Sequence, residues 1–284
     1  MYEVIFLWVL ALFYLIFAVV QDLKTREIAN WLSFSLIIFV LGFRFFYSLF
    51  NNMEFSFFYQ GLIGLGIFFV LGNLFYYGKV FAGGDAKLMI ALGTILPIYP
   101  NLLLNVQTFF NFLLIFLFAG FFYILIASTV LGIKNFSAFK KEFSKQIKKN
   151  KKFIIIISSL SAISLLFGLV NILFFFSGII FFFIYLLYLY SKTIDEVCMV
   201  RQIQTKHLRE GDWLYSDVKI GKNNIIKASW DGLNQKDIKE IKKKFKTIKI
   251  RQGIPFSPNF LISFIIFILL SLSNLHLWNP FWQP

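Results

Sequence analysis

Residues 2–21 read YEVIFLWVLALFYLIFAVVQ, a twenty-residue run that is apolar almost throughout and is followed by Asp22. An α-helix rises 1.5 Å per residue, so about twenty apolar residues cross the roughly 30 Å hydrocarbon core of a bilayer. No basic segment precedes the run, so we expect it to remain as a transmembrane helix rather than to be removed as a signal peptide. The same criterion predicts seven further spans, at about 31–50, 61–81, 88–105, 108–131, 153–171, 172–190 and 256–279.

The composition of the whole chain agrees with this interpretation. Its 284 residues are 58% hydrophobic, include 40 phenylalanines and are charged at only 15% of positions, whereas about a quarter of the residues of a soluble domain are charged. We therefore predict an all-α polytopic membrane protein with about eight transmembrane helices, and with six as the lower bound. One cysteine and two histidines are too few for a disulfide or for a site built from Cys and His ligands, so neither a metal nor a cofactor is expected.

One long polar segment interrupts the apolar runs. Residues 191–255 contain short strand-like stretches and the helix-forming stretch DGLNQKDIKEIKKKFK (231–246), which Asp231 or Asn234 would cap. We expect this segment to be a small α+β insert before the last helix, on the cytoplasmic side. The predicted parts are a membrane core at 1–131, a basic cytoplasmic loop at 132–152, a transmembrane hairpin at 153–190, the soluble insert at 191–255 and the last transmembrane helix at 256–284.

The basic residues fall almost entirely on one side of the predicted spans. With the N-terminus outside, the inside segments are 22–30, 82–87, 132–152 and 191–255, and together with Lys79 they hold 27 of the 28 lysines and arginines. Cytoplasmic loops accumulate such residues, so we expect a multi-pass protein of the cell membrane with its N-terminus outside. The eight lysines of the third segment predict attraction to anionic lipid headgroups, and nucleic-acid binding is not expected.

Two of the few acidic residues in the first two thirds of the chain stand at the inside ends of spans. Asp22 ends the first span, and Asp85 follows two glycines in VFAGGDAKLM (80–89), at the end of the third. The predicted topology places both carboxylates at the cytoplasmic face and at about the same depth, where they can meet. A single aspartate at such a place is often only a helix cap. Two at matched depth are harder to explain in that way.

A pair of carboxylates suits acid–base chemistry. When two of them lie within hydrogen-bonding distance, repulsion and desolvation raise one pKa, so the pair holds a single proton near neutral pH. One can take a proton from water while the other polarises a peptide carbonyl, which would hydrolyse a peptide without a metal. A transporter or channel lined by Asp22 and Asp85 stays open as an alternative, although the spans offer few polar groups near mid-bilayer. A non-catalytic membrane scaffold is the remaining one.

The surroundings of both aspartates resemble the motifs of the type IV prepilin peptidase family. DLKTREIAN (22–30) is similar to the first-aspartate motif of that family. AGGDAKL (82–88) is similar to its second motif, Gly-x-Gly-Asp followed by a basic residue, with Ala82 in place of the first glycine. The later GIPFSP (253–258) resembles the start of the last span in archaeal members, including preflagellin peptidases.

The resemblance implies an aspartic endopeptidase that cleaves basic leader peptides from type IV pilin-like or archaellin precursors, with its active site at the cytoplasmic membrane face. Asp22 and Asp85 would be the catalytic pair, and no cofactor would take part. The residues that would support the site are Gly83, Gly84, Lys87, Arg26 and Asn30. A presenilin-like intramembrane protease, which shares Gly-x-Gly-Asp, is the alternative within this chemistry, although the chain lacks the Pro-Ala-Leu element of that group. The partners implied are the precursor substrates and a bilayer with anionic headgroups, and the oligomeric state stays open.

Overall fold

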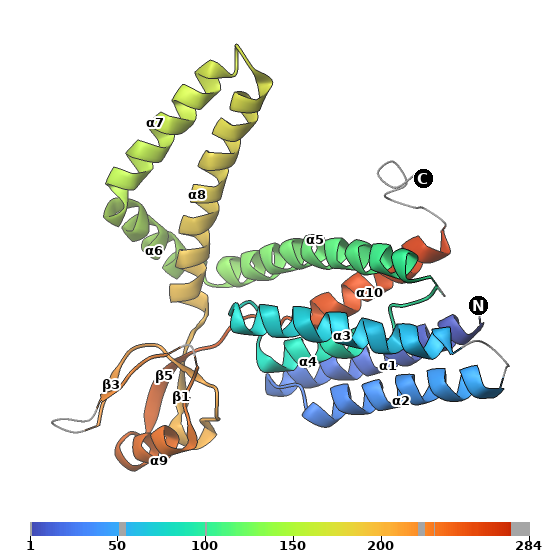
Figure 1. Cartoon of the computed structure of the whole chain (residues 1–284). Coiled ribbons are helices and arrows are strands. Elements are labelled where there is room, and N and C mark those ends of the chain that lie inside the picture. The colour runs from blue at the N-terminus through green and yellow to red at the C-terminus, as the bar shows by residue number, and fades with distance from the viewer. Residues whose placement is uncertain (1, 51–54, 100, 221–224, 230, 274–284) are drawn as a thin grey trace. The chain divides into compact units, whose positions relative to one another are not determined.

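A computed structural model describes residues 2–50, 55–99, 101–220, 225–229 and 231–273 (Figure 1). The helices are α1 (Tyr2–Thr25), α2 (Asn30–Phe50), α3 (Ser56–Tyr77), α4 (Gly83–Gly93), α5 (Leu102–Lys134), α6 (Phe136–Lys149), α7 (Lys151–Phe167), α8 (Ile172–Cys198), α9 (Gln235–Lys244) and α10 (Ser257–Leu272). The strands are β1 (Val200–Gln204), β2 (Trp213–Leu214), β3 (Val218–Lys219), β4 (Ile225–Ile226) and β5 (Thr247–Arg251). The described residues form two compact units, one within 1–124 and 255–284 and the other within 125–254.

Five helices among the described residues are long and apolar enough to cross a membrane, namely α1, α2, α3, α5 and α8. A sixth span results if α6 and α7, which are bent by 76° relative to each other, are taken together. This confirms a mostly helical, multi-pass membrane protein. The structure supports five or six spans by length rather than eight, because the run predicted at 88–105 is divided between the 11-residue α4, a following turn and the first residues of α5. The helices α7 and α10 are also short, at 17 and 16 residues, and residues 274–279 of the predicted last span lie outside the described part.

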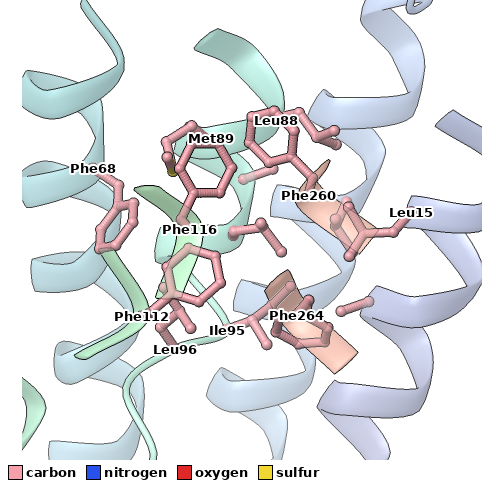
Figure 2. Packing of buried hydrophobic residues seen from close by; sticks show 14 of the residues in the cluster. Leu15, Phe68, Leu88, Met89, Ile95, Leu96, Phe112, Phe116, Phe260 and Phe264 are labelled. Carbon is pink, nitrogen blue, oxygen red and sulfur yellow. The ribbon is translucent and has the colours of Figure 1, made fainter. Parts of the chain in front are cut away.

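The first unit packs its helices around α4. The helix α4 contacts α2 and α3, and α10 contacts α1; in Figure 1, α1 to α4 lie side by side. Figure 2 shows the buried centre, where Leu15, Met89, Phe116 and Phe260 from four different helices meet. Glycine permits the closest approach between α3 and α4, because a Cβ on Gly64 would lie only 2.1 Å from the backbone oxygen of α4's last residue.

A buried arginine donates to backbone carbonyls at the start of α3 and in the turn after α4. Arg44 of α2 is fully buried, and its guanidinium donates to the backbone oxygens of Phe57, Ile95 and Pro97 at 2.9, 3.2 and 2.6 Å. The guanidinium also lies over the Phe57 ring, 4.3 Å from its centroid. A helix leaves its last carbonyls without intrahelical donors, and these must be paired when buried. The one basic residue that sequence places away from the inside segments therefore has a structural role.

The second unit contains a helical hairpin and the insert. In the hairpin α7 and α8 run antiparallel (Figure 1), and Asn171 caps α8 by accepting a hydrogen bond from the Leu173 N–H at 2.9 Å. The insert has a three-stranded antiparallel sheet in the order β1-β5-β2 and a β3–β4 pair. Asn234 and Asp237 form a capping box at the start of α9. The expected small α+β region before the last helix is confirmed.

Candidate active site

Asp22 lies in the last turn of α1 and is buried, with 8% of its surface exposed. Its Oδ2 accepts a hydrogen bond from the backbone N–H of Ser257, the first residue of α10, at 3.3 Å. The helix ends where Arg26 adopts a left-handed φ of 60° and donates its N–H to the Asp22 carbonyl at 2.8 Å. The Gln21 side chain then accepts the Ala29 N–H at 3.0 Å. These bonds fix the turn between the end of α1, where Asp22 lies, and the start of α2.

Asp85 lies in the first turn of α4, which begins at Gly83. A Cβ on Gly84 would lie 3.1 Å from the Cβ of Ile28, tighter than most real Cβ contacts, so a larger residue would push α4 away from the loop after α1. Gly83 and Gly84 are the first two residues of α4, and the close approach of Gly84 to Ile28 brings the start of this helix to the loop after α1. The second motif therefore lies directly against the first.

A side-chain hydrogen bond joins the two motifs a second time. Lys87, on α4, donates from Nζ to Oδ1 of Asn30, the first residue of α2, at 2.6 Å. Of the predicted supporting residues, Gly84, Lys87 and Asn30 therefore connect the aspartate-bearing segments. Gly83 lies in the same helical turn as Asp85, and Arg26 shapes the turn after Asp22.

Asp85, which lies outside the candidate spans, has a raised pKa. Burial raises the pKa of Asp85 most, the negative charge of Asp22 raises it further, and a hydrogen bond with the Ala82 backbone lowers it in part; the result is about 7. A carboxylic acid beside a carboxylate near neutral pH is the combination that general acid–base catalysis requires.

No catalytic role is predicted for α10 from the sequence, yet its start lies against Asp22. Two residues before Ser257, whose N–H bonds to Asp22, the Pro255 carbonyl accepts a hydrogen bond from the Tyr123 hydroxyl of α5 at 2.7 Å. The Phe256 ring lies 6.0 Å from that of Phe81. The sequence signal for this contact is the pair of prolines around the helix start, which the family resemblance had singled out without a physical reason.

Comparison with known proteins covers this same region. Residues 8–132, which include both aspartates, match the family described as the type IV leader peptidase family. These residues belong to the type IV leader peptidase family. The match confirms the resemblance drawn from the two motifs, and the family is one of aspartic-type leader peptidases.

Two archaeal proteins similar to part of this chain are preflagellin peptidases. The protein from Methanococcus maripaludis is 30% identical over 128 residues, which cover 43% of this chain and 55% of the relative. The protein from Methanocaldococcus jannaschii is 34% identical over 85 residues, which cover 30% of this chain and 36% of the relative. The chain thus spans about half the length of these relatives or less. No solved structure gives a significant match.

The part of the chain beyond residue 132, which the family match does not cover, contains a second polar cluster. A cavity of about 320 Å³ in the second unit is lined by Trp213, Tyr215 and Arg251, among others. Arg251 forms ion pairs with Asp195 and with Glu196, the second at 2.9 Å, and Glu196 also accepts the Tyr215 hydroxyl at 2.9 Å. Because these charges pair with one another, the cluster joins α8 to the sheet. Among the described residues, no group of three or more His, Cys, Asp or Glu side chains is arranged to hold a metal ion.

Proposed function

We propose that this chain is an aspartic endopeptidase that removes the leader peptide from type IV pilin-like or archaellin precursors, with Asp22 and Asp85 as its catalytic pair. The match of residues 8–132 to the type IV leader peptidase family and the two preflagellin peptidase relatives support the reaction class. The observation that carries the proposal is the coupling of the two carboxylates. They come from α1 and α4, and the charge of Asp22 helps to raise the pKa of Asp85 to about 7.

The proposed reaction divides its proton transfers between the two carboxyl groups. The ionised carboxylate takes a proton from water, and the water oxygen attacks the carbon of the scissile peptide. The protonated carboxyl keeps its proton and donates a hydrogen bond to the carbonyl oxygen, on which negative charge develops. A proton then passes from the pair to the leaving nitrogen, and the C–N bond breaks. The pair again holds one proton, and no cofactor takes part.

The supporting residues hold the two carboxylates in register. The Lys87–Asn30 bond and the Gly84–Ile28 contact tie α4 to the loop between α1 and α2. Since a general base must lie within hydrogen-bond reach of its proton, a displacement of about 1 Å can cost on the order of a hundredfold in rate. Gly83 places no side chain at the start of α4, and the left-handed backbone of Arg26 turns the chain after Asp22. We assign these residues positioning roles.

We place the site at the cytoplasmic face of the cell membrane, with the N-terminus outside. The distribution of 27 of the 28 basic residues supports this orientation. The lysines of α6 are exposed, and the chain bends between α6 and α7. On the other side of α6, the ring of Phe139 packs against Tyr190 of α8. That arrangement suits anionic lipid headgroups as a second partner.

Cleavage by the purified protein in liposomes tests the proposal. The substrate is a precursor with a lysine-rich leader, and mass spectrometry locates the cut. Asp22→Asn and Asp85→Asn should each lower the rate at least about a hundredfold, the usual contribution of one acid–base group, while the exposed control Lys24→Gln should stay close to wild type. Wild-type rates in both aspartate variants would rule out the catalytic pair. A cut inside the apolar segment of the precursor would favour an intramembrane protease instead.

A further inference from the structure

We propose that the start of α10, residues 255–258, is a third part of the catalytic site, which fixes Asp22 as the charged carboxylate and leaves Asp85 as the proton donor. This inference rests on the proposed function and assigns the two roles that the function leaves open. The start of α10 acts through Asp22, so its residues are positioning residues.

The first ground is the hydrogen bond that Asp22 accepts. The N-terminal N–H groups of a helix have no intrahelical acceptors and carry partial positive charge, which favours an anion at this end. Pro258 has no N–H, and the N–H of Asn259 bonds to the Phe256 carbonyl at 3.0 Å. Ser257 therefore supplies the N–H of this turn that reaches Asp22. An ionised carboxylate is the better acceptor for such a donor, so the bond favours the charged form.

The second ground is that the start of α10 is fixed to α5 on both sides of Ser257. Before it, the Tyr123 hydroxyl donates to the Pro255 carbonyl at 2.7 Å. After it, Asn259 donates to the Phe116 carbonyl at 3.1 Å and is itself fully buried. The rings of Phe116 and Phe260, labelled in Figure 2, lie 4.7 Å apart. The Ser257 N–H is thereby held in place before any substrate binds.

The surroundings of Asp85 differ. Asp85 also lies in the first turn of a helix, and its hydrogen bond with the Ala82 backbone favours its charged form. Burial and the charge of Asp22 outweigh that bond, because the pKa of Asp85 still rises to about 7. One member of the pair is thus held as the anion by α10, and the other takes the proton.

Few other titratable groups compete with this effect. Those on the elements near Asp22 are Asp85 and Lys87 on α4, Tyr123 on α5, and Lys24, Arg26 and Glu27 at the end of α1 and in the loop after it. The helix α10 carries no titratable side chain. On α2, Arg44 bonds to Pro97 and Tyr47 bonds to Glu3, which lies at the other end of α1. The influence of α10 on Asp22 therefore comes from its backbone.

A backbone substitution, compared with a control that has the same side chain, isolates the effect of the Ser257 N–H. Lactic acid in place of Ser257 converts the peptide bond between residues 256 and 257 into an ester and so removes the N–H. The matched control is Ser257→Ala, which has the same side chain as the ester variant and keeps the N–H. Both are made in the full-length protein in liposomes, and kcat, KM and the pH profile of precursor cleavage are measured.

The ester variant should lower kcat about tenfold with KM unchanged, and it should move the acidic limb of the pH profile up by about one pH unit, because the anionic form of Asp22 loses a donor. Both changes are judged against Ser257→Ala, which differs from the ester variant only in keeping the N–H. Tyr123→Phe, which frees the Pro255 carbonyl, should shift the same limb in the same direction by a smaller amount. If the ester variant does not fold, the pH profile of Tyr123→Phe tests the inference instead.

An unchanged acidic limb in the folded ester variant overturns the inference, and so does a shift confined to the alkaline limb. With an unfolded ester variant, an unchanged acidic limb in Tyr123→Phe overturns it. These results differ from failure of the proposed function, in which the wild-type protein leaves the precursor uncut or both aspartate variants keep cutting it.

Discussion

Asp85→Asn should stabilise the folded protein above neutral pH while abolishing the proposed cleavage. The pKa of Asp85 rises from an ordinary value of 3.8 to about 7, mainly through burial and then through the charge of Asp22. Between these values the folded state binds a proton that the unfolded chain has already released, so stability falls as the pH rises from about 4 to about 7. Asparagine is neutral at every pH and does not incur this loss.

The size of the effect follows from the same numbers. A rise from 3.8 to about 7 corresponds to at most about 4 kcal/mol in the free energy of unfolding, at about 1.4 kcal/mol per pH unit. Asp85 is only partly buried, so solvent screening reduces this to roughly 2 kcal/mol. For a chain of this size that amounts to about 5 °C in the unfolding temperature.

Thermal unfolding of the purified protein between pH 4 and pH 8 measures the effect. The unfolding temperatures of wild type and Asp85→Asn should be nearly equal at about pH 4 and should differ by about 5 °C at pH 8, with the variant higher. Glu210→Gln, which neutralises an exposed carboxylate of the insert, should show no such pH-dependent gap. A gap for Asp85→Asn that does not change with pH, or a variant less stable than wild type at pH 8, would refute the reasoning.

Three further predictions concern stability, and chemical denaturation measures each of them as a free energy of unfolding. Gly93→Ala should cost about 1–3 kcal/mol, since its Cβ would lie 2.4 Å from the Cβ of Phe68, whereas Gly66→Ala, whose Cβ would meet nothing within 4 Å, should be tolerated; equal losses would contradict this. Lys79→Gly should gain up to about 1 kcal/mol, because Lys79 has a φ of 62°, and a loss would count against it. Arg44→Met should cost at least about 3 kcal/mol, because three backbone carbonyls lose their donor; unchanged stability would show that these bonds contribute little.

Hydropathy was sufficient to predict the class of fold, because a lipid-exposed helix needs about twenty apolar residues and residues 2–21 meet that need. It could not separate the buried α4 from a span. Both are apolar, and what ends α4 at Gly93 is the turn through Pro97 together with the hydrogen bonds from Arg44. Hydropathy records which residues avoid water, whereas the length of a buried helix depends on its neighbours.

Part of the candidate site could also be predicted from the sequence, and part could not. Asp22 and Asp85 could be selected from the sequence because carboxylates are scarce there and both are predicted at the ends of spans on the same side. The contribution of Ser257 could not, because it is a backbone N–H, and side-chain patterns do not report backbone donors. This donor also lies 235 residues away along the chain, so only the packing of α10 against α1 reveals it.

Asp22 and Asp85 are proposed to share one proton near neutral pH, and infrared titration of the protein in liposomes measures this most directly. The carbonyl stretch of a protonated carboxyl is distinct from that of a carboxylate. A shared proton predicts a band that titrates at about pH 7, disappears in Asp85→Asn and titrates at a lower pH in Asp22→Asn, where the neighbouring charge is gone. A band that persists unchanged in Asp85→Asn, or a wild-type protein without a protonated carboxyl above about pH 6, would contradict a shared proton.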